Sequence, residues 1–237
     1  MTALILSAGG MFAAWEAGVW KVLSRLIRPD VFIGASAGAW NAWLLASGVT
    51  SSELENEWLD PEAHNLLRFR LHRAGILAPG PMHQKARELA ERFRPRAPVA
   101  LTMVELPWLR VRLVRDGEIT WRHLAATCSI PFCFPPVEIE GRRYVDGGLM
   151  GALPVWAAEE MGADRAIAIN AWNKAPFRLL HRAVARRPSP KLHVIRVDPS
   201  RDLGSLVSSL RWDERNICNW IRLGEEDANR AASSITM

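Results

Sequence analysis

Residues 31–48 restrict the fold of this chain more than any other stretch. Residues 31–33 are typical of a buried strand, and residues 37–48 are typical of a helix. They are joined by Gly34-Ala35-Ser36-Ala37-Gly38, which has the G-x-S-x-G form of a nucleophile elbow. A serine on such a turn has strained backbone angles, so its neighbours must be small, as they are here. The stretch predicts an exposed nucleophilic serine, and a glycine- and alanine-rich turn that binds nothing is the alternative.

A second unit of the same kind lies at the start of the chain. Residues 3–6 are typical of a buried strand, Ser7-Ala8-Gly9-Gly10 follows, and residues 11–26 have helical periodicity. Such close succession predicts parallel neighbouring strands, with both turns at the carboxyl edge of the sheet. The amides of Gly9, Gly10 and Met11 are then candidates for an oxyanion hole beside Ser36. The spacing fits neither a dinucleotide-binding loop nor a P-loop.

The general base must be sought far from the serine in the sequence. His181 and His193 follow in an order that an α/β-hydrolase would accept, but neither lies in a glycine- or proline-marked loop. Asp146 does, because two glycines follow it and leave its carboxylate accessible. We therefore expect a Ser36–Asp146 dyad in which Asp146 acts as general base. An ordinary Asp-Gly-Gly turn is the alternative.

The remaining segments surround this predicted site. Residues 51–96 carry short amphipathic patterns around 53–58, 61–72 and 81–93, which predict a small helical cap. The proline-rich residues 131–136 predict a rigid turn that walls a pocket. Residues 177–191 predict a basic loop, and residues 203–232 predict two helices. We expect one domain over residues 1–237.

Composition excludes several classes of protein. With 237 residues, 49% of them hydrophobic, the chain can bury a substantial core. Three cysteines without a C-x-x-C pair argue against a disulfide framework and a zinc site, and we expect no metal or cofactor. There is no nucleic-acid-binding pattern. The chain shows neither a membrane-spanning run nor a signal peptide, which predicts a cytoplasmic protein. Its net charge of +5 would suit peripheral contact with an anionic membrane surface.

Together these pieces resemble the patatin-like phospholipase family over residues 3–170. Three motifs occur in the family's order after the glycine-rich turn: Gly34-Ala35-Ser36-Ala37-Gly38, the stretch from Ser129-Ile130-Pro131 to Phe134-Pro135-Pro136, and Asp146-Gly147-Gly148. The resemblance implies a three-layer α/β/α fold with a mainly parallel central sheet and a small helical cap. It also implies acyl-ester hydrolysis without a metal, with Ser36 as nucleophile, Asp146 as the dyad aspartate, and Gly9, Gly10 and Met11 on the oxyanion loop.

The first loop departs from the family pattern. The family usually has Gly-Gly-Gly-x-Arg/Lys-Gly, whereas this chain has Ala8-Gly9-Gly10-Met11-Phe12-Ala13. Phe12 removes a cation that would help to hold the loop or a lipid phosphate, but the backbone donors remain. We expect a lipid acyl hydrolase of the phospholipase A, lysophospholipase or esterase type that forms an acyl-enzyme. A non-catalytic lipid- or partner-binding protein and an acyltransferase are the alternatives.

Overall fold

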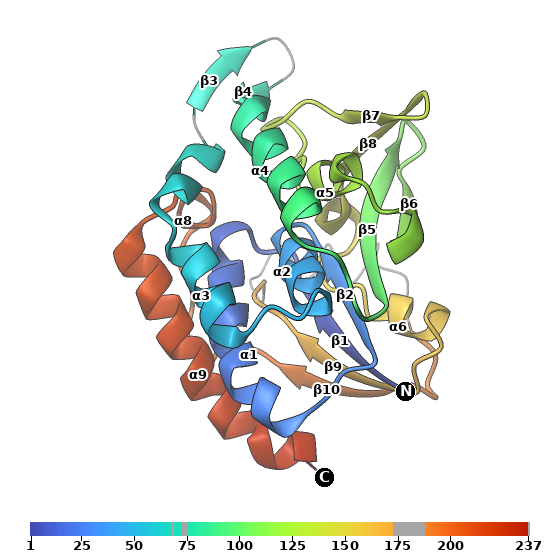
Figure 1. Cartoon of the computed structure of the whole chain (residues 1–237), viewed down its shortest axis with the longest axis vertical. Helices are drawn as coiled ribbons and strands as arrows, with labels where there is room; N and C mark the ends of the chain where they lie inside the picture. The colour runs from blue at the N-terminus through green and yellow to red at the C-terminus, as the bar shows by residue number, and fades with distance from the viewer. Residues whose placement is uncertain (68, 73–74, 173–187, 237) are drawn as a thin grey trace.

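A central sheet of eight strands organises the molecule, and helices lie on both of its faces (Figure 1). The computed structural model describes residues 1–67, 69–72, 75–172 and 188–236. The parallel strands, in their order across the sheet, are β10 (His193–Val197), β9 (Arg165–Ile169), β1 (Thr2–Leu6), β2 (Val31–Ala35) and β5 (Val99–Leu106). The antiparallel strands are β6 (Arg110–Arg115), β7 (Val137–Ile139) and β8 (Arg142–Asp146). The predicted α/β fold with a mainly parallel central sheet is confirmed.

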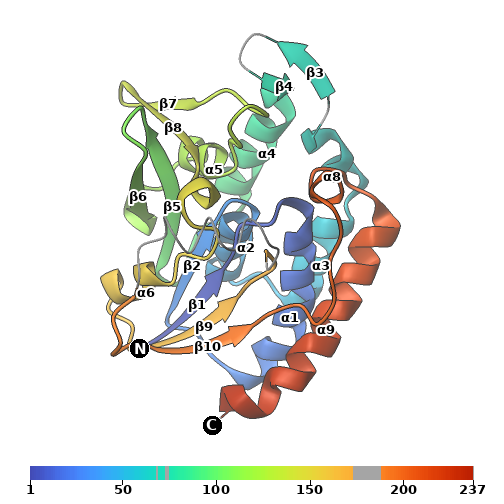
Figure 2. The same cartoon turned by 180° about the vertical axis from the view of Figure 1, so that it is seen from behind.

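Side chains along each strand point alternately to the two faces of the sheet, so the core has one layer on each face. Leu4 and Phe32 belong to the larger cluster, to which α1 (Ala13–Leu26), α2 (Ala37–Ala46) and α9 (Glu214–Thr236) contribute. Ile5 and Ile33 point to the other face, where α6 (Trp156–Glu160) packs (Figure 2). Because successive side chains of a strand point to opposite faces, each strand serves both layers.

The first two strands are parallel neighbours, as predicted. Leu6 of β1 lies opposite Gly34 of β2, so the turns that follow both strands start at the same edge of the sheet. The first turn contains the short 3-10 helix η1 (Gly10–Phe12) before α1 begins. The long α9 runs along α1 and is fixed to it by a hydrogen bond of 2.8 Å from Trp15 Nε1 to Asp227.

The segment predicted as a helical cap is only partly helical. It contains α3 (Ser51–Leu59), the 3-10 helix η2 (Pro61–Leu67) and α4 (Pro79–Arg92). The helix expected through residue 72 is wrong beyond residue 67, because β3 (Phe69–His72) pairs with β4 (Gly75–Leu77) in an antiparallel hairpin. The glycine at position 75 and the β-branched Ile76 favour a strand over continuation of the helix.

The remaining elements are short. They are α5 (Trp121–Thr127), α8 (Leu206–Ser209), η3 (Asp116–Glu118) and η4 (Gly147–Met150). The region predicted as two final helices, 203–232, contains α8 and most of α9. Of the basic loop predicted at 177–191, residues 177–187 lie outside the described residues. In the part of the chain that the structure describes, no helix is long and apolar enough to cross a membrane.

Candidate active site

Ser36 occupies the turn between β2 and α2, in a conformation that few side chains adopt. Its φ of 54° and ψ of −132° lie outside the regions favoured by L-residues, and such strain costs about 1–3 kcal/mol. Close packing around the turn fixes it there. A Cβ on Gly38 would lie 2.3 Å from the carbonyl oxygen of Ser7, and one on Gly34 would lie 2.4 Å from that of Gly38. Glycine at these two positions lets β1, β2 and α2 approach one another.

The strand register brings Asp146 to Ser36. Along one edge of β5, β2 pairs with its first half and β8 with its second half, while β6 pairs along the other edge. Ala35 therefore lies opposite Thr102, and Asp146 lies opposite the next residue, Met103. The strands β2 and β8 run toward each other and end at this point, which places their last residues together.

Ser36 and Asp146 form a direct, buried hydrogen bond. Ser36 Oγ donates to Asp146 Oδ2 over 2.6 Å, and the amide of Gly148 donates to Oδ1 over 2.7 Å. A Cβ on Gly147 would lie 2.2 Å from the carbonyl oxygen of Thr102, so the chain can turn over β5 only with glycine here. The Asp-Gly-Gly motif thus orients the carboxylate toward the serine, and both of its oxygens are occupied.

Burial makes this carboxylate a stronger base than an ordinary aspartate. Desolvation raises the pKa of Asp146 from 3.8 to about 7, although the hydrogen bonds from Ser36 and Gly148 act to lower it. The neighbouring Cys128 contacts the Ser36 hydroxyl, and burial together with the charge of Asp146 raises the pKa of its thiol well above the ordinary value. Cys128 therefore stays protonated near neutral pH.

A cavity of about 410 Å³ opens above the pair. Its walls include the predicted rigid turn, of which Phe132 is 90% exposed, and Leu206 and Leu210 in and after α8. No histidine, lysine or arginine lies on this wall among the residues that the structure describes. His193 is the first residue of β10 and lies at the end of that strand remote from the cavity. His181 lies outside the described residues.

The first loop contributes two of its three predicted residues to the cavity. Gly9 and Gly10 lie on its wall, and neither amide donates to another described residue. Met11 does not line the cavity and its side chain is buried in the core. Phe12 is also buried, with its ring 5.1 Å from that of Trp220, edge to face. The position at which the family usually has a cation therefore faces the core of this protein.

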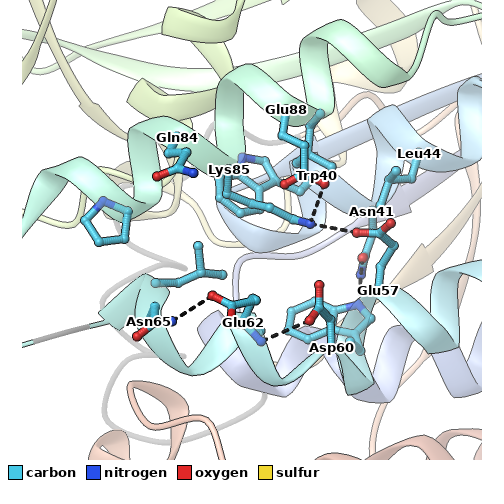
Figure 3. Close-up of a pocket in the computed structure, with 15 residues that line it drawn as sticks. Trp40, Asn41, Leu44, Glu57, Asp60, Glu62, Asn65, Gln84, Lys85 and Glu88 are labelled. Atoms are coloured by element: carbon cyan, nitrogen blue, oxygen red, sulfur yellow. Dashed lines mark hydrogen bonds and ion pairs between the residues drawn. The ribbon is translucent and has the colours of Figure 1, made fainter.

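A second cavity of about 400 Å³ lies between α2, α3, η2 and α4 and shares no lining residue with the first (Figure 3). Lys85 is held in it by Glu57 at 2.8 Å and by Glu88 at 3.2 Å. The charged groups of this second cavity are thus largely paired with one another. Within the described ranges, no three His, Cys, Asp or Glu side chains are grouped so that they could hold a metal ion.

Comparison with known proteins identifies the family. The model of the patatin-like phospholipase family matches residues 4–159, which include both Ser36 and Asp146. The chain therefore belongs to the patatin-like phospholipase family, and this membership supports a lipid hydrolase activity.

Two solved structures are similar to this chain. VipD from Legionella pneumophila is 9% identical with a TM-score of 0.54, over 98% of this chain and 67% of that one. The type III effector protein ExoU is 13% identical with a TM-score of 0.46, over 100% of this chain and 53% of that one. The chain thus spans about two thirds of the one and about half of the other. At this identity, the likeness to VipD shows the fold alone.

The sequence did not indicate that residues at the end of α5 surround the pair, although Ser129 was part of a recognised motif. Thr127, Cys128 and Ser129 all contact Ser36 or Asp146. The available signal was a polar Thr-Cys-Ser run between the apolar residues 124–126 and Ile130. That run lies just ahead of the proline-rich turn.

Proposed function

We propose that this protein is a serine hydrolase that cleaves carboxylic esters of lipids, with Ser36 as nucleophile and Asp146 as general base. The hydrogen bond of 2.6 Å between these two buried side chains is the observation that carries the proposal. A nucleophile within hydrogen-bond reach of a carboxylate whose pKa is about 7 has the arrangement that acid–base catalysis near neutral pH needs.

The reaction starts when Ser36 Oγ attacks the carbonyl carbon of the ester. The hydroxyl proton passes to Asp146 Oδ2, and the carbonyl oxygen becomes an oxyanion. We assign its stabilisation to the loop amides of Gly9, Gly10 and Met11, of which the first two face the cavity. When the C–O bond of the ester breaks, the leaving alcohol takes the proton from Asp146. Water, activated by Asp146 in the same way, then attacks the acyl-enzyme. The bond between Ser36 Oγ and the acyl carbon breaks, Oγ takes the proton back from Asp146, and the carboxylic acid is released.

The cavity suits the acyl part of the substrate. Ile130, Leu149, Leu206 and Leu210 give it an apolar wall that would contact a hydrocarbon chain, and its volume falls in the range of small-ligand sites. Apolar burial of each methylene contributes about 0.8 kcal/mol to binding. A fatty acyl ester is therefore the substrate class that this site supports best.

Hydrolysis of a short-chain nitrophenyl ester by the original chain and by two variants tests the proposal. Ser36→Ala and Asp146→Asn should each lower kcat by about 10³-fold or more, because the nucleophile or its base is lost. Ser47→Ala is a matched control, since it removes another buried hydroxyl at the opposite end of α2, which among the described residues bonds only to the carbonyl of Trp43. Retention of full activity in both variants would rule out the dyad.

The same preparation separates the two alternatives. A non-catalytic binding protein would show no Ser36-dependent turnover while still binding anionic vesicles. An acyltransferase would form the same acyl-enzyme, and adding an alcohol acceptor would shift its products from acid to ester.

A further inference from the structure

The end of α5 contacts the backbone of both members of the proposed dyad. Thr127 is the last residue of α5, and Ser129 lies two residues further on. Both are fully buried. Neither residue belongs to the elbow, to the first loop or to the Asp-Gly-Gly motif.

Thr127 binds the nucleophile through its side chain. The amide N–H of Ser36 donates to Thr127 Oγ1 over 3.0 Å, and the Thr127 hydroxyl donates in turn to the carbonyl oxygen of Thr102 over 2.8 Å. The hydroxyl is thus both acceptor and donor, and it links the elbow to β5. Valine, the isosteric residue, could do neither.

Ser129 binds the other member of the pair through its backbone. The amide of Asp146 donates to the carbonyl oxygen of Ser129 over 3.0 Å. The Ser129 hydroxyl donates to the carbonyl of Ala125 over 2.9 Å, which fixes this turn to α5. One short, rigid segment therefore holds the main chain of Ser36 and the main chain of Asp146 at the same time.

We propose that the Thr127 hydroxyl is a positioning group for the dyad, which holds the backbone of Ser36 so that Oγ stays directed at Asp146. The proposal rests on the catalytic role proposed for these two residues. Ser36 has a positive φ, a conformation that persists only where surrounding contacts enforce it. If the hydrogen bond to Thr127 is lost, the amide of Ser36 is left buried without a partner and the turn relaxes. Thr127 touches neither the ester nor the transferred proton.

A set of variants at Thr127 in the full chain tests this role. Thr127→Val should lower kcat for a nitrophenyl ester by about tenfold to a hundredfold, because small displacements of a reacting group have effects of this size. KM should stay within about twofold, since Thr127 does not line the cavity. Thr127→Ser keeps the hydroxyl and should restore most of kcat. Thr127→Cys, whose sulfur is a weak acceptor, should fall between serine and valine.

Thr102→Val provides a matched control on the neighbouring strand. The Thr102 side chain is buried, and its hydroxyl has no hydrogen-bond partner among the described residues. The same change of a hydroxyl into a methyl group should therefore leave kcat within about twofold. Its main-chain carbonyl, which Thr127 uses, is unaffected.

The outcomes separate the inference from the proposed function. If the original chain shows no Ser36-dependent turnover, the proposed function is wrong and the positioning role falls with it. If turnover depends on Ser36 but Thr127→Val retains the original kcat, only the positioning role is overturned. If the valine variant does not fold, the serine and cysteine variants decide, because equal kcat values for these two would contradict the proposal.

Discussion

The pH dependence of kcat/KM should report the raised pKa of Asp146. A general base works only when it is deprotonated, and desolvation raises the pKa of this carboxyl from 3.8 to about 7. The rate should therefore reach a plateau above about pH 8 and fall about tenfold for each pH unit below 7. At pH 5 it should be about a hundredfold below the plateau, whereas an ordinary aspartate would retain nearly all of the activity there.

The assay is the initial rate of a nitrophenyl ester at concentrations well below KM, from pH 5 to pH 9. Ser36→Ala measured in the same buffers gives the non-enzymatic rate, and circular dichroism establishes that the chain stays folded at pH 5. A profile that stays flat from pH 9 down to pH 5 would refute the idea that a buried Asp146 is the base.

The same shift makes a prediction about stability. Because the folded pKa of Asp146 lies above the unfolded one, the folded state binds more protons, and stability falls as pH rises from about 4 to about 7. At pH 8 the raised pKa of Asp146 lowers the free energy of unfolding by about 4 kcal/mol. Asp146→Asn removes the charge, so it should unfold at higher denaturant concentration than the original chain at pH 8 while losing activity. At pH 4, where Asp146 is protonated in the folded state, the variant should no longer be more stable than the original chain.

Two further variants test the core around the site. Glu16 is fully buried, burial raises its pKa to about 8, and it accepts hydrogen bonds from Ser7 and Asn41. The free energy of unfolding, measured with urea, should fall between pH 5 and pH 9 in both proteins. The fall should be larger in the original chain than in Glu16→Gln, by up to about 5 kcal/mol. Equal falls in the two proteins would contradict this. Phe12→Arg, which restores the family's usual cation, should lower the melting temperature strongly, because the ring packs on Trp220 in the core. An unchanged melting temperature, compared with Phe12→Leu as control, would show that this position tolerates a charge.

The motifs predicted the edge of the sheet where the site lies, but not how its parts meet. The close succession of strands and helices predicted that residues 3–6 and 31–33 form parallel neighbouring strands. This brought the first loop beside Ser36, because parallel strands end at one edge. The approach of Asp146 depends on β2 and β8 sharing one edge of β5. Such a long-range register has no local signature.

Two other features could not be predicted from neighbouring residues, because they too depend on contacts between distant parts of the sequence. The hydroxyl of Thr127 matters through a contact with a residue 91 positions away, so its neighbours in the sequence do not reveal its role. The change from Arg or Lys to Phe12 was visible, but its meaning depends on the packing of Trp220 from the last helix. The strand at 69–72 was not predicted, because a short amphipathic run fits the periodicity of a helix as well as that of a strand.

The most direct test of the account is the site of covalent modification by a fluorophosphonate, read by peptide mass spectrometry. We predict a single adduct on Ser36, formed at a rate that Asp146→Asn lowers by about a hundredfold or more and that Ser47→Ala leaves unchanged. An active preparation whose adduct lies on another residue, or whose Ser36 reacts equally fast without the Asp146 carboxylate, would contradict the Ser36–Asp146 dyad.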